Sequence, residues 1–184
     1  MKLLLYASLP MLGCISATAF AQSGAPFTLL DHKAVKLNAP LAEGDSGKAA
    51  GKISKDKKSL EFAGPDINLV VHTGPEEDML SFRVQGLRNP NLIVHPGATL
   101  HITFVNTDED MFHDMRFGAM RSSFEKTPDV TGTVGSVQLA HSSEDVMNAD
   151  VMTIKAPSKP GKYAYFCSVK GHALGGMRGT ILVR

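Results

Sequence analysis

Short apolar segments alternate with turn-forming residues along the chain from about residue 60 to its end. In one segment Leu100, Ile102 and Phe104 alternate with other residues, so their side chains would share one face of an extended strand. Strands are therefore expected over 67–72, 80–84, 92–94, 100–105, 151–154, 163–167 and 179–184. The pattern predicts an all-β fold arranged as a two-sheet antiparallel sandwich.

Two stretches lack this pattern. Residues 122–148 carry little periodicity, and we expect them to cross from one sheet to the other. Residues 22–58 are polar and rich in glycine, alanine and lysine, so they form either an extension that packs over the edge of the core or a flexible linker. A short helix near 39–43 is compatible with both. We therefore predict an N-terminal extension over 22–58 and a folded domain over 59–184.

The first 21 residues have the features of an export signal. Lys2 precedes a mostly apolar run over 3–15, and Ala19 and Ala21 form a small-x-small cleavage pattern. The run is too short and too interrupted for a membrane span. An alternative lipoprotein-type cleavage would leave Cys14 as a lipidated N-terminus, but its box begins with Met where Leu is usual. Residues 1–21 are therefore predicted to be a signal peptide.

Charge and cysteine content narrow the class of protein. The 19 basic and 18 acidic side chains give a net charge of +1, which argues against a nucleic-acid partner. Removal of the signal peptide takes Cys14 with it and leaves Cys167 as the sole cysteine. A lone thiol cannot form an intramolecular disulfide, so Cys167 is buried, reactive, paired between chains or bound to a metal.

Three potential metal ligands follow one another at five-residue intervals near the C-terminus: Cys167, His172 and Met177. They lie between two expected strands, and three glycines within 171–176 permit a tight loop. Each alone would be an ordinary core thiol, loop histidine or packing methionine. Together, thiolate, imidazole and thioether suit a trigonal copper site that needs one more histidine. His113, just past the strand over 100–105, is the best candidate.

These residues also carry a resemblance to a known family. The run 163–177 reads Tyr-x-Tyr-Phe-Cys-x4-His-x4-Met and resembles the copper loop of cupredoxins, the blue copper proteins. Its spacings match the rusticyanin and sulfocyanin branch, whereas plastocyanins and azurins use others. The segment 96–107 is similar to rusticyanin too, with His113 seven residues after Asn106. The resemblance covers about 51–184.

The resemblance implies one type 1 copper ion with His113, Cys167 and His172 in the trigonal plane and Met177 as the axial ligand. It also implies an eight-stranded Greek-key cupredoxin sandwich with an N-terminal extension. The implied role is single-electron transfer in the periplasm, as a carrier and not an enzyme. The expected partners are redox proteins such as cytochromes or oxidases.

We expect those partners to dock where the outer ring edge of His172 approaches solvent. An apolar rim of Ala173, Leu174 and Gly175 is predicted to form the docking surface and the site of electron entry. Lys170 adds a positive charge nearby, at a position where the family often has proline.

A second departure from the family pattern is Asp114, which follows the first ligand where rusticyanins carry serine. A carboxylate there would favour the cupric state, because charge around the ligands tunes a metal's potential. We therefore predict a lower reduction potential than the resemblance alone implies.

Other functions are compatible with parts of the sequence. The copper could be cargo of a binding or delivery protein, which the methionine content favours slightly. A cysteine hydrolase with Cys167 as nucleophile lacks an evident oxyanion arrangement or orienting carboxylate. The remaining histidines are expected to be surface or strand residues: His32, His72, His95, His101 and His141. A second soft-metal site is the minority interpretation of the methionines, which are expected mostly to pack: Met111, Met115, Met120, Met147 and Met152.

Overall fold

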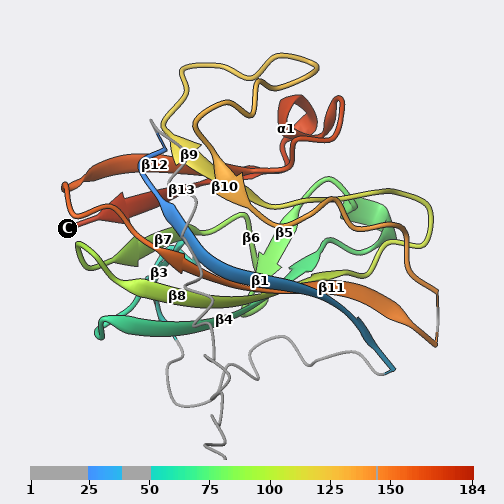
Figure 1. Cartoon of the computed structure of the whole chain (residues 1–184), viewed down its shortest axis with the longest axis horizontal. Helices are drawn as coiled ribbons and strands as arrows, with labels where there is room; N and C mark the ends of the chain where they lie inside the picture. The colour runs from blue at the N-terminus through green and yellow to red at the C-terminus, as the bar shows by residue number, and fades with distance from the viewer. Residues whose placement is uncertain (1–24, 39–50, 144) are drawn as a thin grey trace, which may run out of the picture.

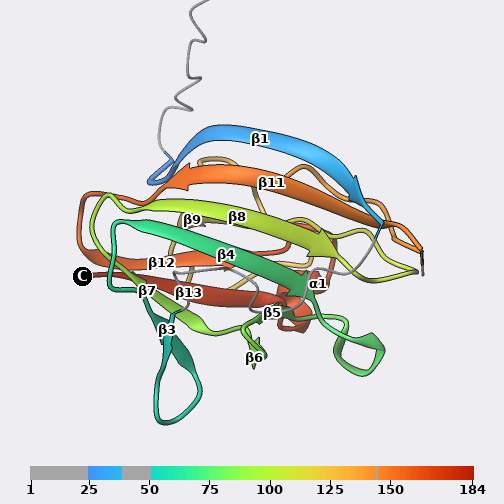
Figure 2. The same cartoon turned by 90° about the horizontal axis from the view of Figure 1, so that it is seen from below.

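The computed structural model describes residues 25–38, 51–143 and 145–184, which form two β-sheets packed face to face (Figures 1 and 2). One sheet has the order β1 (Thr28–Leu37), β11 (Met147–Lys155), β8 (Thr99–Asn106), β4 (Asp66–Thr73), β5 (Phe82–Val84) and β6 (Leu87–Arg88). The other has the order β10 (Val134–Gly135), β9 (Arg116–Ala119), β12 (Gly161–Phe166), β13 (Arg178–Val183), β7 (Asn91–Val94), β3 (Ser59–Glu61) and β2 (Lys52–Ile53).

Helical structure is limited to two short elements in these ranges, the 3-10 helix η2 (Glu76–Asp78) and the helix α1 (His172–Gly175). Figures 1 and 2 both show α1 at the end of the sandwich opposite the C-terminus. Within the described part of the chain, no helix has the length and apolar character needed to cross a membrane. The expected all-β, cupredoxin-like Greek-key sandwich is confirmed.

The expectation of purely antiparallel sheets is wrong. β4 runs parallel to β8, and β7 runs parallel to both β13 and β3. The expectation assumed that each strand pairs with its neighbour in sequence through a hairpin. Instead the chain passes between the sheets, for example from β7 to β8, and it returns to a sheet beside a strand of the same direction. Eight strands were expected, whereas the described residues form thirteen, because several short strands extend the sheets.

The long stretch of low periodicity crosses between the sheets, as predicted. β9 and β10 belong to the seven-stranded sheet, and the chain then enters β11 of the six-stranded sheet. Between β10 and β11, Leu139 pairs with His113 in an isolated bridge. This crossing therefore runs directly past the first of the predicted ligands.

Residues 28–37, which the sequence left open between a packed extension and a linker, form the edge strand β1. β1 pairs antiparallel with β11 from Thr28 opposite Lys155 to Leu37 opposite Met147. Most of its side chains are exposed, which explains why its sequence shows no apolar stripe. The predicted signal peptide and the short helix near 39–43 lie outside the described residues.

The core lies between the two sheets and is built from the predicted alternation. Leu100, Ile102 and Phe104 of β8 are all fully buried. The ring of Phe82 lies 5.9 Å from that of Phe104 and 5.5 Å from that of Tyr165, centroid to centroid. The contact between Phe82 of β5 and Tyr165 of β12 joins the two sheets close to the end of β12. Since Tyr165 is two residues before Cys167, the packed core fixes where the thiol-bearing loop begins.

A close approach of β13 to Tyr165 requires glycine. A Cβ atom at Gly179 would lie 2.2 Å from the tyrosine ring. The hydroxyl of Tyr165 donates a 2.6 Å hydrogen bond to the carbonyl of Pro90, which satisfies this buried polar group. Burial raises the pKa of this phenol well above its ordinary value, so it stays a neutral donor.

Candidate metal centre

The four predicted ligands meet at the α1 end of the sandwich. His113 lies in the loop between β8 and β9, Cys167 follows β12 directly, His172 begins α1, and Met177 precedes β13. All four side chains are buried. The structure thus brings together two segments that are 54 residues apart in sequence at the His113–Cys167 contact.

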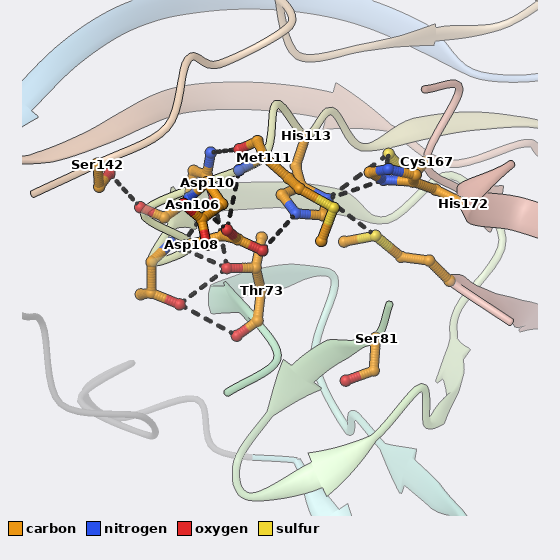
Figure 3. Close-up of polar contacts among 12 residues, drawn as sticks. Thr73, Ser81, Asn106, Asp108, Asp110, Met111, His113, Ser142, Cys167 and His172 are labelled. Atoms are coloured by element: carbon orange, nitrogen blue, oxygen red, sulfur yellow. Dashed lines mark hydrogen bonds and ion pairs between the residues drawn. The ribbon is translucent and has the colours of Figure 1, made fainter. Parts of the chain in front are cut away.

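The donor atoms of His113, Cys167 and His172 point toward one another (Figure 3). His113 Nδ1 lies 3.3 Å from His172 Nδ1 and 3.1 Å from Met177 Sδ. Cys167 Sγ lies 3.6 Å from His172 Nδ1 and 3.9 Å from His113 Nδ1. In the described part of the chain, the ligand atoms of His113, Cys167 and His172 all lie within 4.8 Å of one another, so these side chains could hold one metal ion.

The spacing of these donors fits one small ion. Metal–nitrogen bonds of about 2.0 Å and metal–sulfur bonds of about 2.3 Å, spread at 120°, place ligand atoms about 3.5–3.7 Å apart. The observed separations of 3.3, 3.6 and 3.9 Å scatter around that range. Two imidazoles, a thiolate and a thioether form the donor set expected for copper.

Backbone pairing holds each ligand in place. His113 exchanges two backbone hydrogen bonds with Leu139, with lengths of 3.1 and 2.8 Å. The N–H of Cys167 donates to the carbonyl of Met177 at 3.1 Å, and the N–H of Met177 donates to the carbonyl of His172 at 3.0 Å. The loop between the sulfur ligands is therefore closed on itself, and its ligands cannot move independently.

Two glycines allow this closure. Gly171 and Gly176 flank α1 with φ angles of 89° and 120°, a region that favours glycine. The Asn89 side chain donates a 3.0 Å hydrogen bond to the carbonyl of Gly176, and the N–H of Gly171 donates at 2.6 Å to the carbonyl of Lys126. Segments outside the loop therefore secure both of its turns.

The surroundings of His113, His172 and Cys167 keep these three side chains uncharged at neutral pH when no metal is bound. Burial lowers the pKa of His113, with Asp108 opposing the shift, and burial together with the neighbouring His113 lowers the pKa of His172. Burial and then the charge of Asp114 raise the pKa of the Cys167 thiol to about 12. Both imidazoles therefore keep free lone pairs at neutral pH, while the thiol must lose a proton when it becomes a metal ligand.

A residue that sequence reasoning missed, Asp108, contacts the far edge of the His113 ring. Its Oδ2 lies 3.2 Å from His113 Nε2, and its Oδ1 accepts backbone hydrogen bonds from Asp110 and Met111. Burial acts to raise the pKa of this carboxyl, but these hydrogen bonds outweigh it and hold the pKa below its ordinary value. The only signal in the sequence was an aspartate five residues before a presumed ligand, within an acidic turn.

Asp114 lies beside the thiol-bearing loop. It is buried, and its carboxylate accepts hydrogen bonds from the backbone N–H of Ser168, at 2.5 Å, and from the Ser168 hydroxyl. Ser168 is the residue directly after Cys167, so the carboxylate is held close to the sulfur.

The surface near His172 differs in one respect from the predicted rim. Leu174 is 54% exposed and Gly175 is exposed, but Ala173 is fully buried. Ala173 packs instead in a small cluster with Ala164 and Phe166, because its side of α1 faces β12. The rim prediction is therefore wrong for Ala173.

The other histidines lie apart from this group. His32 is in β1, His72 in β4 and His101 in β8, while His95 and His141 lie outside the strands. His72 is buried and the other four are exposed. Among the methionines expected to pack, Met115 and Met152 are in the core, whereas Met120 is 50% exposed.

No family model matches the sequence, but similar proteins are found by sequence and by structure. Rusticyanin of Acidithiobacillus ferrooxidans is 27% identical over 145 residues, covering 78% of this chain and 89% of that protein. Rusticyanin of Acidithiobacillus ferridurans is 26% identical over 156 residues, covering 84% and 82%.

Solved structures agree with this likeness. Reduced rusticyanin superposes with a TM-score of 0.72 at 24% identity, covering 83% of this chain and 100% of that chain. Rusticyanin from Thiobacillus ferrooxidans superposes with a TM-score of 0.71 at 25% identity, covering 84% and 99%. The chain therefore has the cupredoxin fold and is similar in sequence to rusticyanins, and its cluster of His113, Cys167 and His172 fits a copper site.

Proposed function

We propose that the protein is a periplasmic one-electron carrier with a single type 1 copper ion held by His113, Cys167, His172 and Met177. The observation that carries the proposal is the convergence of two imidazole nitrogens and two sulfurs, all buried, within 3.9 Å along the pairs given above. Copper, when bound, supplies the couple between its cuprous and cupric states.

The residues contribute a site that suits both oxidation states. Sulfur donors favour the cuprous ion, and imidazoles accommodate the cupric ion as well. The bridge from His113 to Leu139 and the backbone hydrogen bond from Cys167 to Met177 hold the donors at nearly constant separations. A site whose ligands barely move needs little reorganisation when an electron arrives or leaves.

Burial of the ligands favours transfer of electrons over binding of substrate. Cys167, His113 and Met177 have no exposed surface, and His172 is 7% exposed. A four-ligand site enclosed in this way leaves no open position of the kind that catalytic metal sites keep. We therefore propose a carrier that exchanges electrons with cytochromes or oxidases through the edge of His172, beside the exposed side chain of Leu174.

The test is voltammetry of the mature, copper-loaded protein together with its rate of copper loss to a chelator. A carrier should give a reversible one-electron wave and should release copper slowly, since the ligands are buried. A protein that delivers copper as cargo should release it readily to a chelator or an acceptor. Fast release without a reversible wave would contradict the proposal.

A further inference from the structure

The ring of His113 has a second polar contact, on the edge that faces away from the other ligands. Nδ1 points toward Met177 and His172, whereas Nε2 points to Asp108 Oδ2 at 3.2 Å (Figure 3). The His113 ring is fully buried and the Asp108 side chain is 5% exposed. Water therefore has little access to either partner.

We propose that Asp108 is a positioning residue that holds His113 in the tautomer with Nε2 protonated and Nδ1 free to bind the metal. Its charge, transmitted through the imidazole, also stabilises the higher oxidation state of the ion. The second part rests on the proposed copper function, whereas the first part concerns the protein alone.

The hydrogen-bond pattern requires both carboxylate oxygens of Asp108 to act as acceptors. Oδ1 accepts from the backbone N–H of Asp110 at 2.8 Å and from that of Met111 at 2.9 Å. Oδ2 is then left for His113 Nε2. An ionised carboxylate only accepts, so a hydrogen bond at Oδ2 places the proton on Nε2. Since neutral imidazole carries one proton, Nδ1 keeps its lone pair.

The turn that carries Asp108 is itself fixed by buried polar groups. Asn106 Oδ1 accepts from the Asp108 N–H at 3.0 Å, and Asn106 Nδ2 donates to the carbonyls of Met111 and Ala140 at 2.9 and 2.8 Å. Asn106 is fully buried. The turn that carries the carboxylate is therefore fixed by three hydrogen bonds before any metal binds, which is the arrangement expected of a preorganised outer ligand shell.

The charge has a predictable direction of effect. A buried carboxylate in contact with a ligand favours the more positive ion, and the low local polarity strengthens the interaction. Asp108→Asn removes this charge with little change in size, and its amide offers one acceptor oxygen to three N–H donors. The variant should bind the cupric ion about tenfold less tightly relative to the cuprous ion, which for one electron is a rise of about 59 mV.

The first test needs no metal. Nitrogen-15 NMR of the apo protein, at a pH where the imidazoles are neutral, reports which nitrogen of each histidine carries the proton. The expected result is a protonated Nε2 on His113 in the native sequence and a mixed or inverted tautomer in Asp108→Asn. A native His113 protonated on Nδ1 would overturn the assignment, even if the variant failed to fold.

The second test compares potentials. Glu109→Gln is the matched control, because it removes the same charge from the adjacent exposed residue, for which no contact with His113 is seen. Asp108→Asn should raise the potential clearly more than Glu109→Gln does. Equal reduction potentials of the two variants would contradict the proposed effect of the Asp108 charge. If the native protein binds no copper but shows the predicted tautomer, the carrier function fails and the positioning role of Asp108 stands.

Discussion

The two halves of the metal centre are held by different means. The half that carries His113 depends on buried polar side chains, since Asn106 and Asp108 hydrogen-bond within the turn and against the ring. The half that carries Cys167, His172 and Met177 depends mainly on backbone hydrogen bonds within one short loop, and contacts from Asn89 and Lys126 secure the turns of that loop. Side-chain networks fail when one member is removed, whereas a closed loop tolerates side-chain changes but not changes at its turns.

The largest expected effect is on the His113 half, from Asn106→Ala. The substitution removes the side-chain hydrogen bonds of residue 106 to the carbonyls of Met111 and Ala140 and to the N–H of Asp108. The Ala140 carbonyl keeps a second donor, Asn148 Nδ2 at 3.3 Å. Loss of these three buried or partly buried hydrogen bonds should lower the free energy of unfolding by about 3 kcal/mol. Urea unfolding of the apo protein measures this. A loss below about 1 kcal/mol would show that the network does not hold this half together.

The matching change on the other half is Gly176→Ala. A Cβ there would meet nothing closer than 3.7 Å, so the cost comes from the φ of 120° alone. We expect a loss of about 1–2 kcal/mol together with an altered copper spectrum, because Met177 is the next residue. Gly64→Ala is the control, since its Cβ would likewise meet nothing closer than 3.8 Å and its φ lies outside the positive region. Equal effects of the two substitutions would contradict the account of the loop.

Lower pH should reduce the free energy of unfolding of the apo protein, because each half of the site contains a buried neutral histidine. The pKa values of His113 and His172 lie below 6.5 in the folded protein, so the unfolded chain takes up protons first. The stability that these two neutral histidines contribute is therefore fully present above pH 6.5, and it is lost as the pH falls from 6.5 toward their pKa values in the folded protein. Unfolding curves between about pH 8 and 5 measure the slope, and His172→Gln should reduce it. A flat or inverted slope would contradict burial of neutral imidazoles.

Asp114→Ser tests the charge nearest the sulfur. Because Asp114 accepts the N–H of Ser168, its carboxylate lies beside the residue that follows Cys167. Removal of the charge should raise the reduction potential, by about 59 mV if the relative cupric affinity falls tenfold. Redox titration measures the shift. A potential that stays the same or falls would show that this carboxylate does not favour the cupric state.

The smallest expected effect on the protein itself comes from Leu174→Lys. This side chain is 54% exposed, so stability and potential should change by little. The rate of electron transfer to a physiological partner should nevertheless fall, because a charge now interrupts the apolar surface beside His172. Stopped-flow kinetics measure the rate, and an unchanged rate would place the docking surface elsewhere.

The sequence alone pointed to the part of the candidate site that depends on spacing. One loop carries three potential metal ligands at equal intervals, Cys167, His172 and Met177, so a metal site could be predicted from their spacing alone. His113 could be chosen because it follows a clear strand. Asp108 could not, since nothing in the sequence shows that a turn folds a carboxylate back against a ring five residues later.

The fold shows the same division. Strands with strict alternation, such as β8, were predicted close to their observed ends, because burial on one face leaves a period of two. β1 was not recognised because an edge strand exposes most of its residues. The parallel pairing of β4 with β8 was missed because strand direction depends on connections between sheets, which local patterns do not encode.

The visible spectrum of the copper-loaded mature protein, compared with that of Cys167→Ser, tests the central claim most directly. The account predicts an intense blue or green colour in the oxidised native protein, which arises from the thiolate–copper bond, and its loss in the variant. A colourless oxidised native protein, or a spectrum that the substitution leaves unchanged, would contradict it.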